Sequence, residues 1–290
     1  MSVCEHLLPH PMKFQSKGST QQWHAPIVMA VLNVTPDSFS DGGKYVSADA
    51  AIERAQAMLE EGAEIVDIGG ESTRPGAQAV TASQEMDRVI PIIEALRSRT
   101  DKLISIDTSK PAVMAAACAA GADIINDVRA LQEPGALEAA AQSGAAVCLM
   151  HMQGQPRTMQ QAPEYENVVS EVYEFLAHRV TECESAGIGR NRILVDPGFG
   201  FGKTLAHNLQ LLAHIPQFTT LELPVLVGLS RKSMFRELLG LEQPEQRVAA
   251  SVAAATLAVR GGANIVRTHD VAQTRDAIGV AAALNRLTKV

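Results

Sequence analysis

The stretch Gly62-Ala63-Glu64-Ile65-Val66 decides the fold class, because variants of it recur along the chain. The other copies are Gly121-Ala122-Asp123-Ile124-Ile125, Gly144-Ala145-Ala146-Val147 and Gly262-Ala263-Asn264-Ile265-Val266. Each copy follows an alanine-rich stretch with helical periodicity. The pattern predicts a helix that ends at a left-handed glycine, followed by a short turn into a buried strand. Strands that are apolar on both faces and alternate with helices are typical of a parallel sheet.

Four more apolar segments fit between these copies, at residues 27–32, 103–106, 192–195 and 224–227. The chain of 290 residues therefore holds eight strand candidates, each followed by a helix candidate. A barrel of eight such units takes roughly 250 residues, so we predict an α/β fold, a single (β/α)8 barrel of the TIM type. An open doubly wound sheet is the alternative. The Gly-x-Gly-x-x-Gly loop of its dinucleotide-binding version is missing after the first strand.

Local signals support helices after the strands. Thr81 and Gln84 form a capping-box pattern, and Pro111 suits the first helical turn after Thr108 or Ser109. No linker divides the chain. We therefore predict one barrel domain over residues 25–290, preceded by a preamble, residues 1–24, of undefined structure.

Composition excludes several classes of protein. The 25 Lys and Arg residues face 32 Asp and Glu residues, a net charge of −7, which argues against a nucleic-acid partner. Four dispersed cysteines predict neither disulfides nor a zinc site, and Cys118 and Cys148 are interpreted as small buried apolar residues. The first 22 residues lack the features of a signal peptide, and no apolar run approaches the roughly 20 residues of a membrane span. We expect a cytoplasmic protein with no membrane partner.

Polar residues end most of the predicted strands. A single such residue is more often a helix cap or turn residue, but a full set of them predicts an active site at the carboxyl-terminal rim of a barrel. The strand-end residues are Asn33, Asp67, Asp107, Asn126 with Asp127, Met150 with His151, Asp196, Gly228, and Arg267 with His269.

Loops at this rim add binding groups. Residues 35–43 and 69–76 carry hydroxyls, glycines and Arg74, which suit closure around an anion. Residues 196–204 resemble a phosphate-binding P-loop, but Pro197 stands where that motif needs glycine. We interpret this loop as a sharp turn that presents Asp196 and either Phe199 or Phe201 to a planar ligand. Residues 230–233 are expected to begin a helix whose free N–H groups favour a carboxylate or phosphate.

Taken together, these segments closely resemble the dihydropteroate synthase family. The second loop reads Gly69-Gly70-Glu71-Ser72-Thr73-Arg74-Pro75-Gly76, and the other matching segments follow in the family's order, at residues 32–43, 106–111, 125–127, 150–154, 196–200, 230–232 and 267–270. Ala30 stands where the family often has glycine. The resemblance implies a barrel that joins 6-hydroxymethyl-7,8-dihydropterin diphosphate to 4-aminobenzoate, giving 7,8-dihydropteroate and pyrophosphate in folate synthesis. Members of the family are sulfonamide targets.

The resemblance also implies roles for residues. It assigns the pterin diphosphate to Thr73, Asp107, Asn126, Met150, Asp196, Phe201, Gly228, Lys232, Arg267 and His269. It assigns 4-aminobenzoate to Phe39, Thr73, Arg74 and Ser233, and Mg2+ to Asn33. It assigns catalytic roles to Asp107, Lys232, Arg267 and Asp41. Family members are usually homodimers, and the apolar segment 247–259 would suit such a contact, although packing within the barrel explains it equally well.

Two alternatives use the same pterin pocket. One is a methyltransferase barrel that handles methyl-tetrahydrofolate, which should lack the two 4-aminobenzoate loops and the Ser-Arg-Lys element found here. The other is an inactive relative that binds a pterin as a regulator or as a subunit of a complex. Pyrophosphate release would discriminate between these readings and the synthase.

Overall fold

Eight parallel strands form the centre of the molecule. The structure is a computed structural model and describes residues 11–34, 44–71, 79–154, 159–160 and 162–287. In space the strands follow the order β8-β7-β6-β5-β4-β3-β10-β9. Their bounds are β3 Ile27–Asn33, β4 Ile65–Gly69, β5 Leu103–Asp107, β6 Ile124–Asp127, β7 Ala146–Met150, β8 Ile193–Asp196, β9 Leu226–Gly228 and β10 Ile265–Thr268.

The two outer strands of this order meet and close the sheet. Val195 on β8 forms a parallel bridge with Val225, just before β9, and its N–H donates to the carbonyl of Pro224 at 3.0 Å. An open doubly wound sheet has free edges at these positions. The predicted barrel is therefore confirmed, and the alternative of an open sheet is wrong.

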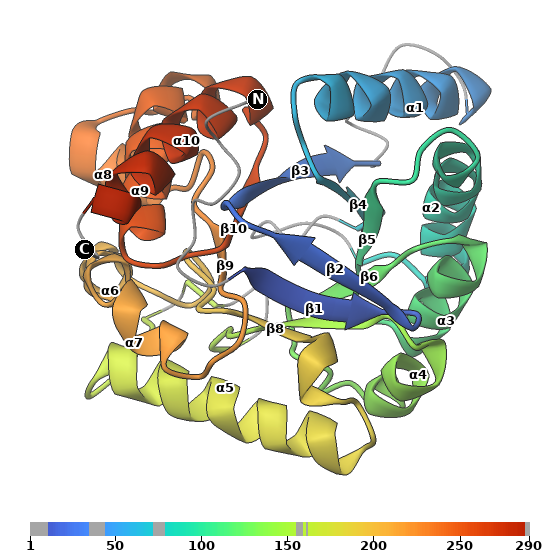
Figure 1. The fold of residues 1–290 in the computed structure, drawn as a ribbon, viewed down its shortest axis with the longest axis horizontal. Helices are drawn as coiled ribbons and strands as arrows, with labels where there is room; N and C mark the ends of the chain where they lie inside the picture. The colour runs from blue at the N-terminus through green and yellow to red at the C-terminus, as the bar shows by residue number, and fades with distance from the viewer. Residues whose placement is uncertain (1–10, 35–43, 72–78, 155–158, 161, 288–290) are drawn as a thin grey trace.

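Helices surround the strands on the outside (Figure 1). They are α1 Lys44–Glu60, α2 Ala82–Arg97, α3 Pro111–Ala120, α4 Ala136–Ser143, α5 Val168–Ser185, α6 Leu205–Ala213, α7 Ile215–Thr219, α8 Met234–Leu239, α9 Val248–Arg260 and α10 Val271–Leu287, with short 3-10 turns η2 Arg190–Arg192 and η3 Pro244–Arg247. One apolar cluster fills the space between strands and helices, and a second fills the barrel. None of the described helices is both long and apolar enough to cross a membrane.

The local signals in the sequence hold. The N–H of Gln84 donates to the Thr81 hydroxyl at 3.2 Å and the N–H of Thr81 donates to the Gln84 side chain at 2.9 Å, which is the capping box of α2. Pro111 is the first residue of α3, directly after Lys110. The glycines at 62, 121, 144 and 262 all have positive φ angles, as the recurring stretch predicts.

Two predicted strands begin later than the sequence indicates. Arg192 belongs to the turn η2, where its guanidinium donates to the carbonyl of Ala145. Pro224 precedes β9, because proline has no N–H to donate to a sheet.

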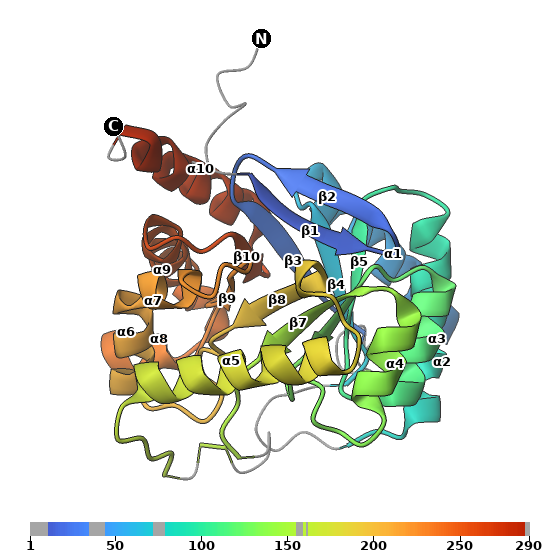
Figure 2. The same ribbon diagram turned by 60° about the horizontal axis from the view of Figure 1, so that its bottom comes forward.

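A hairpin covers the end of the barrel at which the strands begin. It consists of β1 Met12–Ser16 and β2 Ser19–Trp23, and Figure 2 shows it lying across that end. Met12 and Phe14 are buried against the first residues of the strands, including Ile27 and Ile265. The Ser16 hydroxyl donates to a carbonyl between α3 and β6 at 2.5 Å. Residues 12–23 of the preamble therefore form a defined element, and the domain boundary near residue 25 stays a prediction.

The cysteines within the described part of the chain are structural. Cys118, Cys148 and Cys183 are buried and carry free thiols, and Cys118 and Cys148 lie in the apolar clusters. The interpretation of Cys118 and Cys148 as small buried apolar residues is confirmed.

Candidate active site

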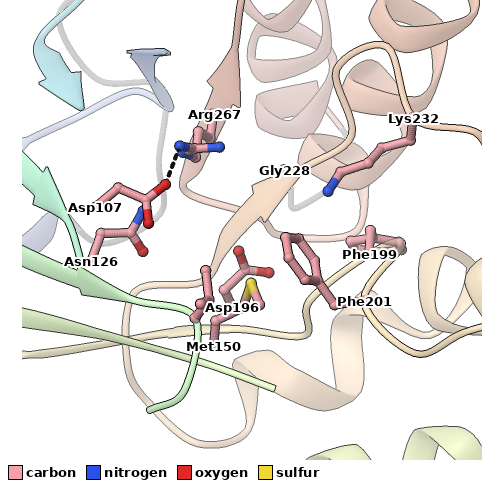
Figure 3. A pocket seen from close by; sticks show the side chains of 10 residues that line it. Asp107, Asn126, Met150, Asp196, Phe199, Phe201, Gly228, Lys232 and Arg267 are labelled. Carbon is pink, nitrogen blue, oxygen red and sulfur yellow. Dashed lines mark hydrogen bonds and ion pairs between the residues drawn. The ribbon is translucent and has the colours of Figure 1, made fainter. Parts of the chain in front are cut away.

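The carboxyl ends of the strands surround one cavity of about 340 Å³, which includes its mouth. Figure 3 shows its polar and aromatic side chains facing a common space. Of the residues assigned to the pterin diphosphate, eight line it. These eight are Asp107, Asn126, Met150, Asp196, Phe201, Gly228, Lys232 and Arg267, and the wall is completed by Val128 and Phe199.

Arg267 on β10 forms ion pairs with acids on β4 and β5, two neighbouring strands that are far from it in sequence. Its Nε donates to Asp67 Oδ2 at 2.6 Å, and its Nη2 donates to Asp107 Oδ2 at 2.7 Å. The amide of Asn126 donates to the same oxygen of Asp67 at 3.1 Å. Asp67 is completely buried, so it serves as an anchor that orients both Arg267 and Asn126. Burial works against the charge of Arg267, but Asp67 and Asp107 outweigh it and raise the pKa of Arg267 above its usual range.

Asp67 belongs to the strand-end set that predicts the active site, but the family resemblance assigns it no role. It stands on β4 two residues before the strand ends, and its contacts with Arg267 and Asn126 place it in the site. Val128 was missed as well, since an apolar residue after a strand carries no chemical signal.

Burial controls the charge of the two acids that line the cavity. It raises the pKa of Asp107 to about 7, and the Arg267 guanidinium opposes this rise. It raises the pKa of Asp196 to about 6, while the Gly198 N–H, at 2.7 Å from Asp196 Oδ1, favours the carboxylate. The pKa values of both acids therefore lie near neutral pH. Such shifted pKa values are common at active sites.

A cation and an aromatic ring form the opposite wall. The Lys232 ammonium lies 4.2 Å from the centroid of the Phe201 ring, which is a cation–π contact. Burial and Arg267 together lower the pKa of Lys232 to about 8, whereas Asp196 and Asp107 oppose the change. The wall thus offers a flat apolar face and a positive charge.

The loop after β8 makes the sharp turn that the sequence predicts. Gly198 has a φ angle of +73°, and a Cβ atom there would lie 1.9 Å from the carbonyl oxygen of His151. Only glycine allows this approach. The turn brings both Phe199 and Phe201 to the cavity. The sequence predicts one or the other, and both line the wall.

Three assigned residues lie outside the cavity lining. Asn33 ends β3, and a Cβ built on Gly69 would lie 3.8 Å from Asn33 Oδ1 and 3.6 Å from Asp107 Cβ, so the Asn33 amide is close to the Arg267 ion pair. His269 contacts the Ser230 hydroxyl through Nδ1 at 3.0 Å. Ser233 is exposed. Phe39, Asp41, Thr73 and Arg74 fall outside the described residues.

The helix expected to begin within residues 230–233 begins later, at Met234. Arg231 has a φ angle of +55°, which a helix does not permit, and its guanidinium donates to Asp270 at 2.6 Å. The helix α8 is short, and Ser233 makes no side-chain cap. Ser233 is the N-cap of α8, so the prediction holds at this last residue and is wrong for residues 230–232.

A metal would find few protein ligands here. Within the described ranges, no group of three or more His, Cys, Asp or Glu side chains could hold one. Magnesium often uses one or two protein oxygens together with substrate phosphates. The Asn33 amide oxygen has the chemistry for such a ligand.

Comparisons with known proteins point in one direction. A family model described as pterin binding enzyme matches residues 29–269. Dihydropteroate synthase of Escherichia coli K12 is 51% identical over 269 residues, which cover 93% of this chain and 95% of that protein.

Solved structures agree with this. Xanthomonas albilineans dihydropteroate synthase with 4-aminobenzoic acid has 52% identity and a TM-score of 0.89, covering 95% of this chain and 98% of that one. The Xanthomonas albilineans enzyme in complex with 7,8-dihydropteroate has 50% identity and a TM-score of 0.85, covering 94% of this chain and 98% of that one.

Proposed function

Because the chain belongs to the dihydropteroate synthases, a family of pterin-binding enzymes, we propose that its barrel cavity holds the dihydropterin diphosphate for attack by 4-aminobenzoate. The activity is that of a dihydropteroate synthase, a transferase of the folate pathway that forms 7,8-dihydropteroate. The observation that carries the residue assignments is the cavity itself, in which two buried acids and an amide face an aromatic wall and a lysine.

The polar edge of the cavity suits a pterin ring. Such a ring presents N–H donors and acceptor atoms in a row, and carboxylates and an amide pair with these groups selectively. Asp107, Asn126 and Asp196 supply these partners, while Met150 and Phe201 pack on the ring faces. The Asp107 oxygen that Arg267 contacts is then shared or exchanged with the pterin.

The leaving diphosphate is assigned to the positive side of the rim. Arg267 and His269 would stabilise the negative charge that grows as the carbon–oxygen bond breaks, with Thr73 and Asn33 beside them. Mg2+, bound at Asn33, would supply further charge stabilisation for the diphosphate.

Bond making and breaking need no protein nucleophile. The bond between the pterin methylene carbon and the diphosphate oxygen breaks, and the nitrogen of 4-aminobenzoate forms the new bond and loses a proton. The carboxylates of Asp107 and Asp196 would stabilise positive charge on the pterin methylene if the old bond breaks first. Lys232 contacts the Phe201 ring and is proposed to hold the pterin. Asp41 is proposed to shield or assist the cation.

The second substrate is assigned to residues at the mouth. Phe39, Thr73 and Arg74 would contact 4-aminobenzoate, and its carboxylate would lie at Ser233. The exposure of Ser233 is compatible with a ligand that enters from solvent.

Pyrophosphate release from the purified protein tests the reaction. The dihydropterin diphosphate, 4-aminobenzoate and Mg2+ are each omitted in turn, and dihydropteroate is identified as a product. We expect release to require all three. Pterin binding without turnover would favour the regulatory relative instead. The identity with a synthase over 93% of the chain already favours this reaction over methyl-tetrahydrofolate chemistry.

A homodimer through the late helices is the proposed assembly. The helices α9 and α10 pack against each other. α9 buries Ala254, Ala255 and Ala258, yet Leu257 of α9 and Val280 of α10 stay 59% and 62% exposed. Packing within the barrel explains the buried alanines but not these exposed residues. Leu257→Glu is expected to shift the protein from dimer to monomer in sedimentation velocity, while Glu138→Gln on α4 leaves the dimer intact. A monomeric wild-type protein would contradict the assembly.

The cytoplasm remains the proposed location. The buried free thiols are compatible with a reducing compartment. Cell fractionation tests this.

A further inference from the structure

Lys203 is a buried lysine directly behind the pocket. The residue is only 3% exposed, although lysine is almost always solvated. It belongs to the loop between β8 and α6 and does not line the cavity. A buried cation needs hydrogen-bond acceptors, and the acceptors of Lys203 show which segments of the chain it connects.

The Lys203 ammonium joins two loops of the active-site rim. Its Nζ lies 2.9 Å from Nδ1 of His151 and 3.4 Å from the carbonyl oxygen of His151, in the loop after β7. It also donates to the carbonyl of Phe201 at 3.0 Å. His151 directly follows Met150, the last residue of β7, so each of the two segments that Lys203 connects carries a residue of the cavity wall, Met150 in one and Phe201 in the other.

His151 is suited to accept this bond. Burial and the nearby Lys203 ammonium together lower the pKa of His151 to about 2, so the ring is neutral. A neutral ring with its proton on Nε2 offers the lone pair of Nδ1. The ring is held edge-on to Phe175, with centroids 4.9 Å apart and an interplanar angle of 87°.

Lys203 acts together with two neighbours on one stretch of backbone. Three consecutive carbonyls accept hydrogen bonds from three different side chains. Gln160 donates to Gly200 at 2.5 Å, Lys203 to Phe201 at 3.0 Å, and Tyr165 to Gly202 at 2.8 Å. The backbone that carries the Phe201 ring is therefore fixed from outside, while Lys232 contacts the ring from the cavity side.

We propose that Lys203 is a positioning residue that holds Phe201 and Met150 in place for the pterin ring, a role that rests on the proposed function of the cavity. Burial lowers the pKa of Lys203 to about 7, and Asp196 opposes this. An ammonium buried without a carboxylate in contact costs folding free energy that an apolar side chain of similar length does not. The hydrogen bonds of Lys203 to the segments that carry Met150 and Phe201 account for a lysine at this position.

The test compares folding with pterin binding in Lys203→Met. The dissociation constant of 6-hydroxymethylpterin is measured by fluorescence titration, beside the midpoint of urea unfolding. We expect Lys203→Met to unfold at the wild-type urea concentration or higher and to bind the pterin about tenfold more weakly. In steady-state kinetics the KM for the pterin diphosphate should rise by a similar factor while kcat changes less than about twofold.

Two further variants complete the design. Tyr165→Phe removes the bond to the next carbonyl and should weaken pterin binding about threefold. Lys102→Met is the matched control, because Lys102 pairs with Glu64 before the first residue of β5, at the opposite end of the barrel, and pterin binding should not change.

The outcomes are separable. A folded Lys203→Met protein that binds pterin as tightly as the wild type would overturn the proposal. If that variant does not fold, unchanged binding by Tyr165→Phe would overturn it instead. A wild-type protein that binds pterin but releases no pyrophosphate contradicts the proposed reaction, and the comparison of dissociation constants still decides the role of Lys203.

Discussion

Asp107 shows how burial and an ion pair set the chemistry of a single side chain. Its carboxylate is held by Arg267 at 2.7 Å in a cavity that raises its pKa to about 7. Below that pH the group is mostly protonated and presents one acceptor fewer to the pterin. The affinity for the pterin therefore depends on a proton equilibrium close to neutral pH.

We predict that pterin binding tightens as pH rises from about 5.5 to 7.5, because Asp107 becomes a carboxylate over this range. Asp107→Asn should weaken binding at pH 7.5 by roughly tenfold or more, the usual cost of losing a charged hydrogen-bond partner, and should flatten this part of the pH dependence. Fluorescence titration of 6-hydroxymethylpterin measures both effects. Asp101→Asn, at an exposed position before β5, is the control. Equal affinity of Asp107→Asn and wild type would remove Asp107 from pterin recognition.

At the scale of elements, the loops after β7 and β8 pack backbone against backbone. Gly198 makes this contact possible, because it combines a left-handed φ of +73° with direct contact to the His151 carbonyl. A side chain at this position would push the loop that carries Phe201 away from the segment that directly follows Met150.

A pair of glycine substitutions separates the requirement for a left-handed φ angle from the requirement for space beside the His151 carbonyl. Gly18 has a φ of +78° but nothing within 4 Å of a Cβ atom, so Gly18→Ala should cost only the conformational penalty, roughly 1 kcal/mol. Gly198→Ala adds the clash with His151 and should lower kcat/KM by about a hundredfold or more, as misplaced active-site groups do. Urea unfolding and steady-state kinetics measure the two effects. Similar losses in both variants would show that conformation alone is responsible.

The hairpin β1–β2 contributes to stability at the end of the barrel opposite the site. Phe14 is 1% exposed and packs on the Trp23 ring at 5.5 Å between centroids. Phe14→Ala should lower the free energy of unfolding by about 3 to 5 kcal/mol, whereas kcat stays near the wild-type value under conditions that keep the protein folded. Thr20→Ala, at an exposed position of β2, serves as control in the same urea titration. A loss of kcat without a loss of stability would mean that the hairpin acts on the site.

At the scale of the whole molecule, the cavity imposes a cost on folding. Burial raises the pKa of Asp196 to about 6, above the ordinary value of 3.8. The folded state thus binds this proton more tightly than the unfolded chain does. The contribution of Asp196 to stability is present below about pH 4 and is lost as pH rises through about 6.

Asp196→Asn removes this proton equilibrium and provides the test. The free energy of unfolding of the wild type, measured relative to Asp196→Asn, should rise as pH falls from about 7 to 4. Urea titrations of both proteins across this range, without ligand, give the difference. A difference that grows in the opposite direction would mean that Asp196 is held as a stabilised carboxylate in the folded protein.

Local patterns in the sequence predict the barrel and the polar residues at the ends of its strands. The glycine-capped helices and the strands that are apolar on both faces are local patterns, and local backbone preferences and side-chain periodicity produce them without knowledge of distant contacts. Residues at strand ends, such as Asp107 and Asp196, could be assigned because a parallel barrel brings all carboxyl ends to one rim.

Which of these groups touch, and whether they are charged, depends on the folded arrangement of the chain. Arg267 reaches Asp107 and Asp67 across 160 and 200 residues of sequence. No local pattern encodes such contacts, because they depend on how strands far apart in the chain pair in the closed barrel. The burial of Lys203, the raised pKa of Asp107 and the hairpin under the barrel have the same origin. All three depend on which groups the folded chain buries away from water. The order of residues along the chain does not specify this burial.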